Sequence, residues 1–359
     1  MPVTPNATEN LPPAPPGRPF QTALSDVRQA DWSQQQFLSA VVLLPAVGLS
    51  LAWGAWRGDP PAGVMAAGGA VAVGFGAFHR LGRYRTLPLG LTLIAMAVST
   101  FVGSVAHRGG WPAQFVIATV WGWAFGLVTT LGWGAWWVGL QGIVGLLAFG
   151  SIPADVPTAA FHAGMVVIGG VVQLAAAHGV WRFVRLPDEP KDAIPDAWWH
   201  ALCKNVSFST AGGRHALRVA MAMGLGSLAH NGLGLPHGYW MPMTAAILLK
   251  PDLHETAVRG LARLGGTLVG AGVVTLITAT VRPDATALNV GLLVAIWACF
   301  ALQKVNYALH STCITAYVVF TLAAAGLPEP STAAYRVIAT LGGALIALLV
   351  HAVPLQRKT

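Results

Sequence analysis

The chain has 359 residues, of which 55% are hydrophobic and 9% are charged, and its formal net charge is +8. Soluble domains carry roughly 25% charged residues, so this chain has too few charges to cover the surface of a globular protein in water. Several uninterrupted apolar runs reach the ~20 residues that a helix needs to cross a bilayer. The sequence therefore predicts an all-α integral membrane protein.

Residues 1–34 contain the stretch PPAPPGRP and predict a disordered, Pro-rich tail without the layout of a signal peptide. Apolar runs between charge clusters then predict about twelve spans. Six lie in the first half, near 37–56, 61–78, 87–106, 112–130, 133–150 and 157–181. Six lie in the second half, near 214–232, 238–249, 258–280, 287–303, 308–326 and 333–353.

The most charged segment of the chain, RFVRLPDEPKDAIPDAWWHALCKN, separates the two sets of spans. It predicts a first transmembrane repeat over 35–182, a cytoplasmic linker over 183–212, a second repeat over 213–354 and a cytoplasmic tail over 355–359. The two sets of spans share a weak pattern. The stretch RGDPPAGVMAAGG lies at the position in the first set that corresponds to LGLPHGYWMPMTA in the second. Six spans per unit predict two repeats in parallel orientation, a common transporter plan.

Positive charge orients the predicted spans. Alternate loops are rich in Lys and Arg, whereas the opposite loops hold only four such residues, which are Arg57, Arg108, Arg282 and Arg336. The positive-inside rule therefore predicts that both termini are cytoplasmic.

One helix combines arginines with a glycine pair. Asp252 can cap its start, with Glu255 completing a capping box. Arg259, Arg263, Gly266 and Gly270 then follow at steps of four, three and four residues, which places them on one stripe. The glycines allow a neighbouring helix to come close, so both arginines are expected to face protein or a water-filled cavity. Topological anchoring explains Arg259 alone equally well.

The apolar run before this helix is too short to span a bilayer. His237 to Leu249 would form a helix of ~20 Å, against a hydrocarbon core of ~30 Å, and it contains Pro242. We therefore expect a short or broken helix near 238–249. Its end would face the arginines, a combination that favours binding of an anion such as a carboxylate.

The run HALRVAMAMGLG…GLPHGYWMPMTAAILLKPDLHETAVRGLARLGGTLVGAG resembles the fusaric acid resistance-like and aromatic acid exporter superfamily, as does Asn306-Tyr307-Ala308-Leu309 followed by Thr315. The resemblance covers about residues 205–355. It implies export of aromatic or other organic carboxylates across the inner membrane of a bacterium, a resistance role and a substrate contact at Thr244 in the short "T-A" helix. Family exporters often carry a large cytoplasmic domain, for which this chain has no room, so coupling and partner binding stay open.

Several other polar residues are candidates for the site. Arg218 lies far along a span, where a cation either snorkels to the interface or faces an aqueous cavity. Trp240 offers an aromatic face, and Tyr307 and His310 lie three residues apart on one helix face. The predicted substrate-binding set is Arg218, Trp240, Thr244, Arg259, Arg263 and Tyr307. The predicted proton or gating set is His254, Lys304 and His310, although a simple turn also explains Lys304.

No nucleotide-binding loop, zinc spacing or catalytic triad is present, so we expect no cofactor, no metal site and no enzymatic activity. All thirteen acidic residues lie in termini, loops or span ends. We therefore expect export to be driven by the membrane potential, the proton gradient or both. A passive organic-anion channel and a non-transporting scaffold subunit are the alternatives. The expected partners are the bilayer and a small organic anion, with no nucleic acid; a homo-oligomer or a periplasmic adaptor stays open.

Overall fold

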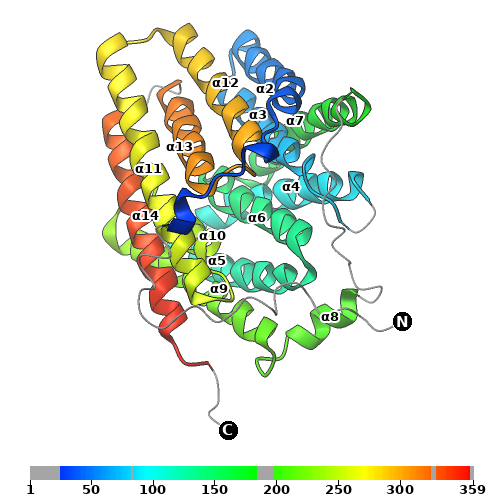
Figure 1. Ribbon diagram of the computed structural model, residues 1–359, viewed down its shortest axis with the longest axis vertical. Helices are drawn as coiled ribbons and strands as arrows, with labels where there is room; N and C mark the ends of the chain where they lie inside the picture. Colours follow the sequence, from blue (N-terminus) through cyan, green and yellow to red (C-terminus); the bar gives the residue numbers. More distant parts are fainter. Residues whose placement is uncertain (1–24, 82–83, 184–197, 325–328, 356–359) are drawn as a thin grey trace.

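The computed structural model describes residues 25–81, 84–183, 198–324 and 329–355. Within these ranges the chain is helical (Figure 1), apart from its turns and one isolated bridge between Leu81 and Tyr84. The first half contains η1 (Trp32–Gln34), α2 (Phe37–Arg57), α3 (Pro60–Gly76), α4 (Thr86–Arg108), α5 (Gly110–Val128), η2 (Thr129–Leu131), α6 (Trp133–Leu147), η3 (Phe149–Ser151) and α7 (Val156–Phe183). The second half contains α8 (Trp198–Asn205), α9 (Ala211–Leu233), α10 (Trp240–Leu248), α11 (Leu253–Val281), α12 (Ala285–Leu302), α13 (Tyr307–Ala324) and α14 (Glu329–Ala352).

The all-α membrane class is confirmed. Every predicted span coincides with a helix, and in the described residues eight helical segments are long and apolar enough to cross a membrane. They are α2, α4, α5 with η2, α6 with η3, α7, α11, α12 and α14. The chain is thus a multi-pass membrane protein, whereas crossing by α3, α9, α10 and α13 stays a prediction.

Local signals in the sequence set several helix ends. The carboxylates of Asp59, Asp252 and Asp284 accept hydrogen bonds from the first turns of α3, α11 and α12. Gly58 and Gly234 end α2 and α9 in the left-handed region, which glycine adopts without steric cost. The short helix expected near 238–249 is α10, which has nine residues and no break.

Corresponding helices pack in the same pairs in both halves. In the first half α3 packs on α2 and α7, and α4 packs on α6 and α7. In the second half α10 packs on α9 and α14, and α11 packs on α13 and α14. The halves meet where α5 lies along α9 and where α12 lies along α2 (Figure 1).

The glycine stripe of α11 makes the close helix contact that its spacing predicts. A Cβ added at Gly266 would lie 2.5 Å from the Ala308 carbonyl oxygen, and one at Gly270 would lie 2.5 Å from that of Thr312. The backbones of α11 and α13 therefore touch along this stripe, and Arg263 on the same face points inward with 4% of its surface exposed.

Residues 25–34 of the predicted N-terminal tail lie against the turn between α12 and α13. The Asp31 amide donates to the Val305 carbonyl at 2.9 Å, and Asn306 Nδ2 donates to the Val27 and Gln29 carbonyls at 2.8 and 2.6 Å. These bonds order residues 25–34 because the turn between α12 and α13 offers backbone and amide groups to a segment that lacks a fold of its own. Residues 1–24 lie outside the described part of the chain.

The predicted linker over 183–212 contains α8, whose eight residues are WWHALCKN. Residues 184–197 of the linker and 356–359 of the predicted tail lie outside the described residues.

Candidate functional site

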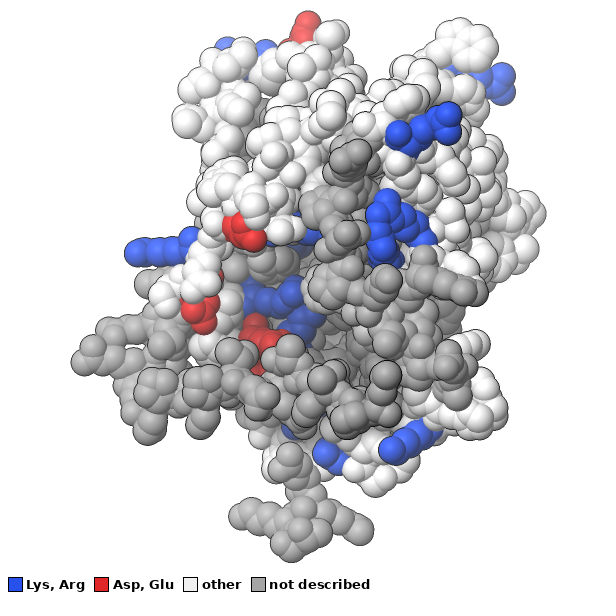
Figure 2. All heavy atoms as spheres, turned by 45° about the vertical axis from the view of Figure 1, so that its right-hand side comes forward, with Lys and Arg blue, Asp and Glu red and all other residues white. Residues whose placement is uncertain are grey.

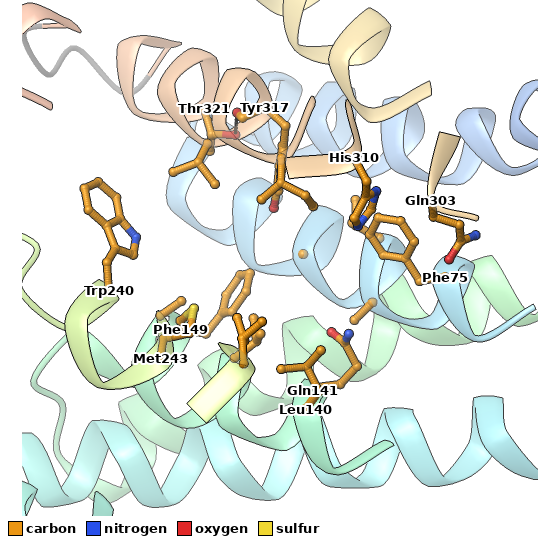
Figure 3. A pocket seen from close by; sticks show the side chains of 18 of the residues that line it. Phe75, Leu140, Gln141, Phe149, Trp240, Met243, Gln303, His310, Tyr317 and Thr321 are labelled. Atoms are coloured by element: carbon orange, nitrogen blue, oxygen red, sulfur yellow. Dashed lines mark hydrogen bonds between the residues drawn. The ribbon is translucent and has the colours of Figure 1, made fainter. Parts of the chain in front are cut away.

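A cavity of about 1600 Å³ lies between the two halves of the chain. Its lining includes Asn289, Leu292 and Leu293 in the first half of α12 and Gln303 just after the end of that helix. At 1.5 Å per residue Asn289 and Gln303 are ~21 Å apart along the helix axis. The cavity therefore reaches both ends of α12, and we call it the passage. Figure 3 shows Tyr317 and His310 of α13 directed into it from one side and Leu140 and Gln141 of α6 from the other.

One wall of the cavity carries three arginines. Arg259 and Arg263 come from α11 and Arg336 comes from α14, and all three line the space. Arg263 and Arg336 are 4% and 2% exposed. Figure 2 shows Lys and Arg side chains inside a hollow on one face of the molecule, with acidic groups beside it.

The two buried arginines lack partners for their charge. Among the described residues neither guanidinium forms an ion pair, and the Nε of each has no hydrogen-bond partner. A buried charge is costly unless it is paired and hydrogen-bonded. An anionic ligand in the cavity would supply both, and guanidinium groups bind carboxylates through two parallel hydrogen bonds.

Aromatic rings support the cationic groups at both ends of α10. At its start the Arg336 guanidinium lies 4.8 Å from the Trp240 ring. Beyond its end Lys250 Nζ lies 4.1 Å from the Trp136 ring, and the Arg259 guanidinium lies 5.0 Å from the Tyr307 ring. The nine residues of α10 span about 13 Å. The cations therefore form a row along this short helix rather than a single cluster.

Uncharged polar atoms of α13 also face the row without partners. The Tyr307 hydroxyl and His310 Nδ1 are buried and have no hydrogen-bond partner among the described residues. The His310 ring packs edge-on against Phe75, with ring centroids 5.6 Å apart. Both free atoms can therefore be offered to a bound ligand.

Lys304 closes one end of the passage, in the turn between α12 and α13. Its Nζ donates to the Phe78 carbonyl at 2.8 Å. Burial lowers the pKa of the Lys304 ammonium to about 8. Burial, followed by the Lys304 charge, lowers the pKa of the neighbouring His79 to about 3. At neutral pH this end of the cavity thus carries a lysine cation beside a neutral imidazole.

The predicted site residues divide into two groups. Six of them line the cavity: Trp240, Arg259, Arg263, Lys304, Tyr307 and His310. The other three do not. Arg218 lies on α9 away from the lining. Thr244 of α10 is buried against Gly343 of α14. His254 pairs with Asp26 at 3.2 Å. The functional roles of all nine stay predictions.

Arg336 was missed by the sequence interpretation, which counted it as a residue of an outer loop. A signal for it exists. Arg263-x3-Thr267-x2-Gly270 on α11 recurs as Arg336-x3-Thr340-x2-Gly343 on α14. Gly343 approaches α10 as closely as Gly270 approaches α13, since a Cβ there would lie 2.7 Å from the Met241 carbonyl oxygen. The spacing places each arginine on the packed face of its helix.

Comparisons with known proteins agree with this layout. Residues 221–350 match the family described as fusaric acid resistance protein-like. The chain is similar to an uncharacterized protein of Synechocystis sp., with 30% identity over 152 residues, covering 42% of this chain and 20% of that protein. It is also similar to the inner membrane protein YccS of Escherichia coli, with 30% identity over 164 residues, covering 45% of this chain and 22% of that protein.

The uncharacterized protein ORF2 of Neisseria gonorrhoeae is 25% identical over 149 residues, which are 42% of this chain and 36% of that protein. The chain thus spans only part of the length of these relatives, and no solved structure matches it. The family match contains α10 to α14 and all three cavity arginines. The resemblance over about residues 205–355 is confirmed: residues 221–350 of this membrane protein form a fusaric acid resistance protein-like region.

Proposed function

We propose that the chain exports aromatic or related organic carboxylates through the cavity between its two halves. The observation that carries this proposal is the pair of buried guanidinium groups, Arg263 and Arg336, which face one passage with no carboxylate partner among the described residues. Such groups are costly in a membrane protein and generally mark substrate or ion pathways. Tryptophan and tyrosine rings beside the arginines suit an aromatic body next to the anionic group.

We further propose twelve spans in two six-helix repeats, with both termini on the cytoplasmic side of a bacterial inner membrane. The shared helix pairs of the two halves support the repeats. So does the recurrence of Gly-Gly-x7-His, as Gly169-Gly170…His178 on α7 and as Gly342-Gly343…His351 on α14. The asymmetry of Lys and Arg between alternate loops supports the orientation, and similarity to a protein named as an inner membrane protein supports the location.

The membrane potential is a sufficient driving force for such export. Moving one elementary charge across 100 mV is worth ~2.3 kcal/mol, which sustains an outward gradient of roughly 50-fold for a monovalent anion. The row of cations along α10 lowers the cost of placing that anion between the helices. Export of an anion from a negative interior then needs no coupled ion, although a proton gradient can add to the force.

We expect efflux of an aromatic carboxylate from proteoliposomes to follow an imposed potassium diffusion potential. Flux should rise as valinomycin and an outward potassium gradient make the inside more negative, and it should fall when valinomycin with equal potassium on both sides holds the potential at zero. A flux that does not change with the imposed potential but changes with an imposed pH gradient would contradict potential-driven export. It would point to the histidines as proton carriers.

A passive organic-anion channel is the second candidate, favoured by the length of the passage along α12. The two candidates differ in turnover. A channel passes current that planar-bilayer recording resolves and that does not saturate at low substrate concentration, whereas a carrier saturates at modest rates.

A further inference from the structure

A second wall of the cavity is largely apolar. The cavity lining contributed by residues 48–152 contains no Lys, Arg, Asp or Glu among the described residues, and its polar members include His79 and Gln141. Most of its large members are methionine, leucine, valine and aromatic side chains, including Met65, Phe75, Leu140, Val144 and Phe149. Residues 48–152 therefore supply mainly apolar surface, whereas the arginines come from α11 and α14.

A repeated spacing shows how the two walls come to differ. The spacing x3-Thr-x2-Gly that follows Arg263 and Arg336 recurs on α4 as Met96-x3-Thr100-x2-Gly103. Gly103 packs as the others do, because a Cβ there would lie 2.3 Å from the Leu146 carbonyl oxygen of α6. Met96 on α4 thus occupies the position that corresponds to Arg263 on α11 and Arg336 on α14, and it is fully buried. An apolar side chain therefore replaces the cation at this position of the first half.

The size of the cavity agrees with a ligand that reaches this wall. Pockets for drug-sized molecules measure about 300–1000 Å³, and this cavity measures about 1600 Å³. A single-ring carboxylate bound to the arginines would leave most of the apolar wall uncovered.

We propose that the site takes amphiphilic carboxylates with an extended apolar body, such as alkyl-substituted or multi-ring acids, in preference to single-ring acids. The carboxylate binds the arginines of α11 and α14, and the apolar body lies against Val144 and Phe149. The inference rests on the proposed function and adds the substrate class to it.

The test is a binding series of benzoate, 4-butylbenzoate and 4-octylbenzoate on the full chain in nanodiscs. Binding is read from tryptophan fluorescence and corrected with empty nanodiscs for partition into lipid. Burying a methylene favours binding about fourfold, so the butyl compound should bind at least tenfold more tightly than benzoate. Phe149→Ala should flatten this dependence on chain length, whereas Phe161→Ala, the same change on an exposed ring of α7 outside the lining, should keep it.

The outcomes separate the two proposals. If the corrected affinities of the three acids are equal, the apolar-body inference is overturned while the anion site stands. If none of the three acids binds, the proposed function fails with it. Equal flattening by Phe149→Ala and Phe161→Ala would show that the effect does not come from the cavity wall.

A separate observation concerns the segment over residues 25–36, which we name the strap. It runs from α11 to the end of α12 (Figure 1), and its residues Asp26, Gln29, Ala30 and Asp31 line the cavity. His254 of α11 pairs with Asp26, Asn306 donates to the Val27 and Gln29 carbonyls, and the Gln36 amide donates to the Ala301 carbonyl at 2.9 Å. Asp26 and Asp31 of the strap line the same end of the cavity as Lys304 and Arg259.

We infer that the strap is an autoinhibitory gate. Its two carboxylates occupy the end of the passage where an anionic substrate would first meet cations, and its hydrogen bonds tie together the helices that form this end. Passage of substrate then requires the strap to leave. Few apolar contacts and several exposed hydrogen bonds hold it, which is typical of segments that open at low cost.

A disulfide between positions 31 and 305 tests the gate. The Asp31 amide nitrogen lies 2.9 Å from the Val305 carbonyl oxygen, so the two residues are neighbours, and a disulfide needs Cα atoms 4.4–6.8 Å apart. Asp31→Cys and Val305→Cys are combined with Gln141→Cys as a reporter on the cavity wall, after the three native cysteines are replaced by alanine. Oxidation should close the 31–305 bond and slow labelling of position 141 by an anionic methanethiosulfonate at least tenfold from one side of the membrane.

The comparison is the Asp31→Cys and Gln141→Cys pair, oxidised in the same way, together with reversal of the lock by a reductant before labelling. Asn306→Ala, which removes two of the strap's hydrogen bonds, should speed labelling instead. Labelling that is equally fast with the bond closed would overturn the gate, as would failure of the two introduced cysteines to form the bond.

Discussion

Replacing Arg336 by methionine should lower carboxylate flux at least tenfold while leaving the thermal stability of the protein unchanged or raised. The guanidinium is 2% exposed and has no anionic partner among the described residues. Methionine keeps the length of the stem and removes a buried, uncompensated charge, which favours folding. A charged hydrogen bond to a carboxylate is worth about 1.5–3 kcal/mol, and its loss corresponds to a tenfold or larger drop in affinity.

The flux is measured in proteoliposomes and the stability by thermal denaturation in detergent, with Arg263→Met expected to behave in the same way. Arg57→Ala, a change of an exposed arginine at the end of α2 outside the cavity, is the control and should leave flux unchanged. A variant Arg336→Met that loses stability together with flux would instead mean that the arginine holds the fold. Full flux in both methionine variants would mean that the row of cations has no part in transport.

Leucine at Gly270 should destabilise the protein strongly, whereas leucine at Gly272 on the same helix should not. A Cβ at position 270 would lie 2.5 Å from the Thr312 carbonyl oxygen, but one at position 272 would meet no atom within 4 Å. Overpacking costs typically 1–3 kcal/mol, and here α11 must move away from α13 because the obstacle is backbone. We expect the melting temperature to fall by at least about 5 °C.

Both variants are purified in one detergent and compared by thermal denaturation and gel filtration. The displacement should also misplace Arg263, so any folded Gly270→Leu protein should show reduced flux. Equal melting temperatures for the two leucine variants would mean that α11 and α13 are not held by this glycine contact.

Much of the fold follows from local sequence features. Apolar run length and the charges between runs placed a helix in each expected span, since the bilayer demands that backbone polar groups be satisfied within each segment. Asp252 before Leu253 set the start of α11, and the Gly266 and Gly270 spacing predicted a close neighbour. In the same way, the step of four residues between Arg259 and Arg263 predicted that both face one direction.

What the sequence could not supply was the identity of the neighbours. Arg218 and Arg336 both lie well inside apolar helices, and hydropathy alone does not separate them. Arg336 faces the cavity because α14 packs between α10 and α11, whereas α9 lies along α5 and leaves Arg218 outside the lining. Residues 25–34 were predicted to be disordered because hydropathy and composition do not show their hydrogen bonds to Asn306, some 280 positions later in the chain.

The sequence by itself thus determined the class of this protein, the position of its helices and the family of its second half. These properties depend on residues that are close in the chain, through hydropathy, capping and helical spacing. The tertiary structure alone decided which cations share a cavity, that an apolar wall faces them and that residues 25–36 cross its end. Those features arise from packing between helices that are far apart in the chain. A glycine on a helix face allows another backbone to come close, but it does not specify which helix will do so.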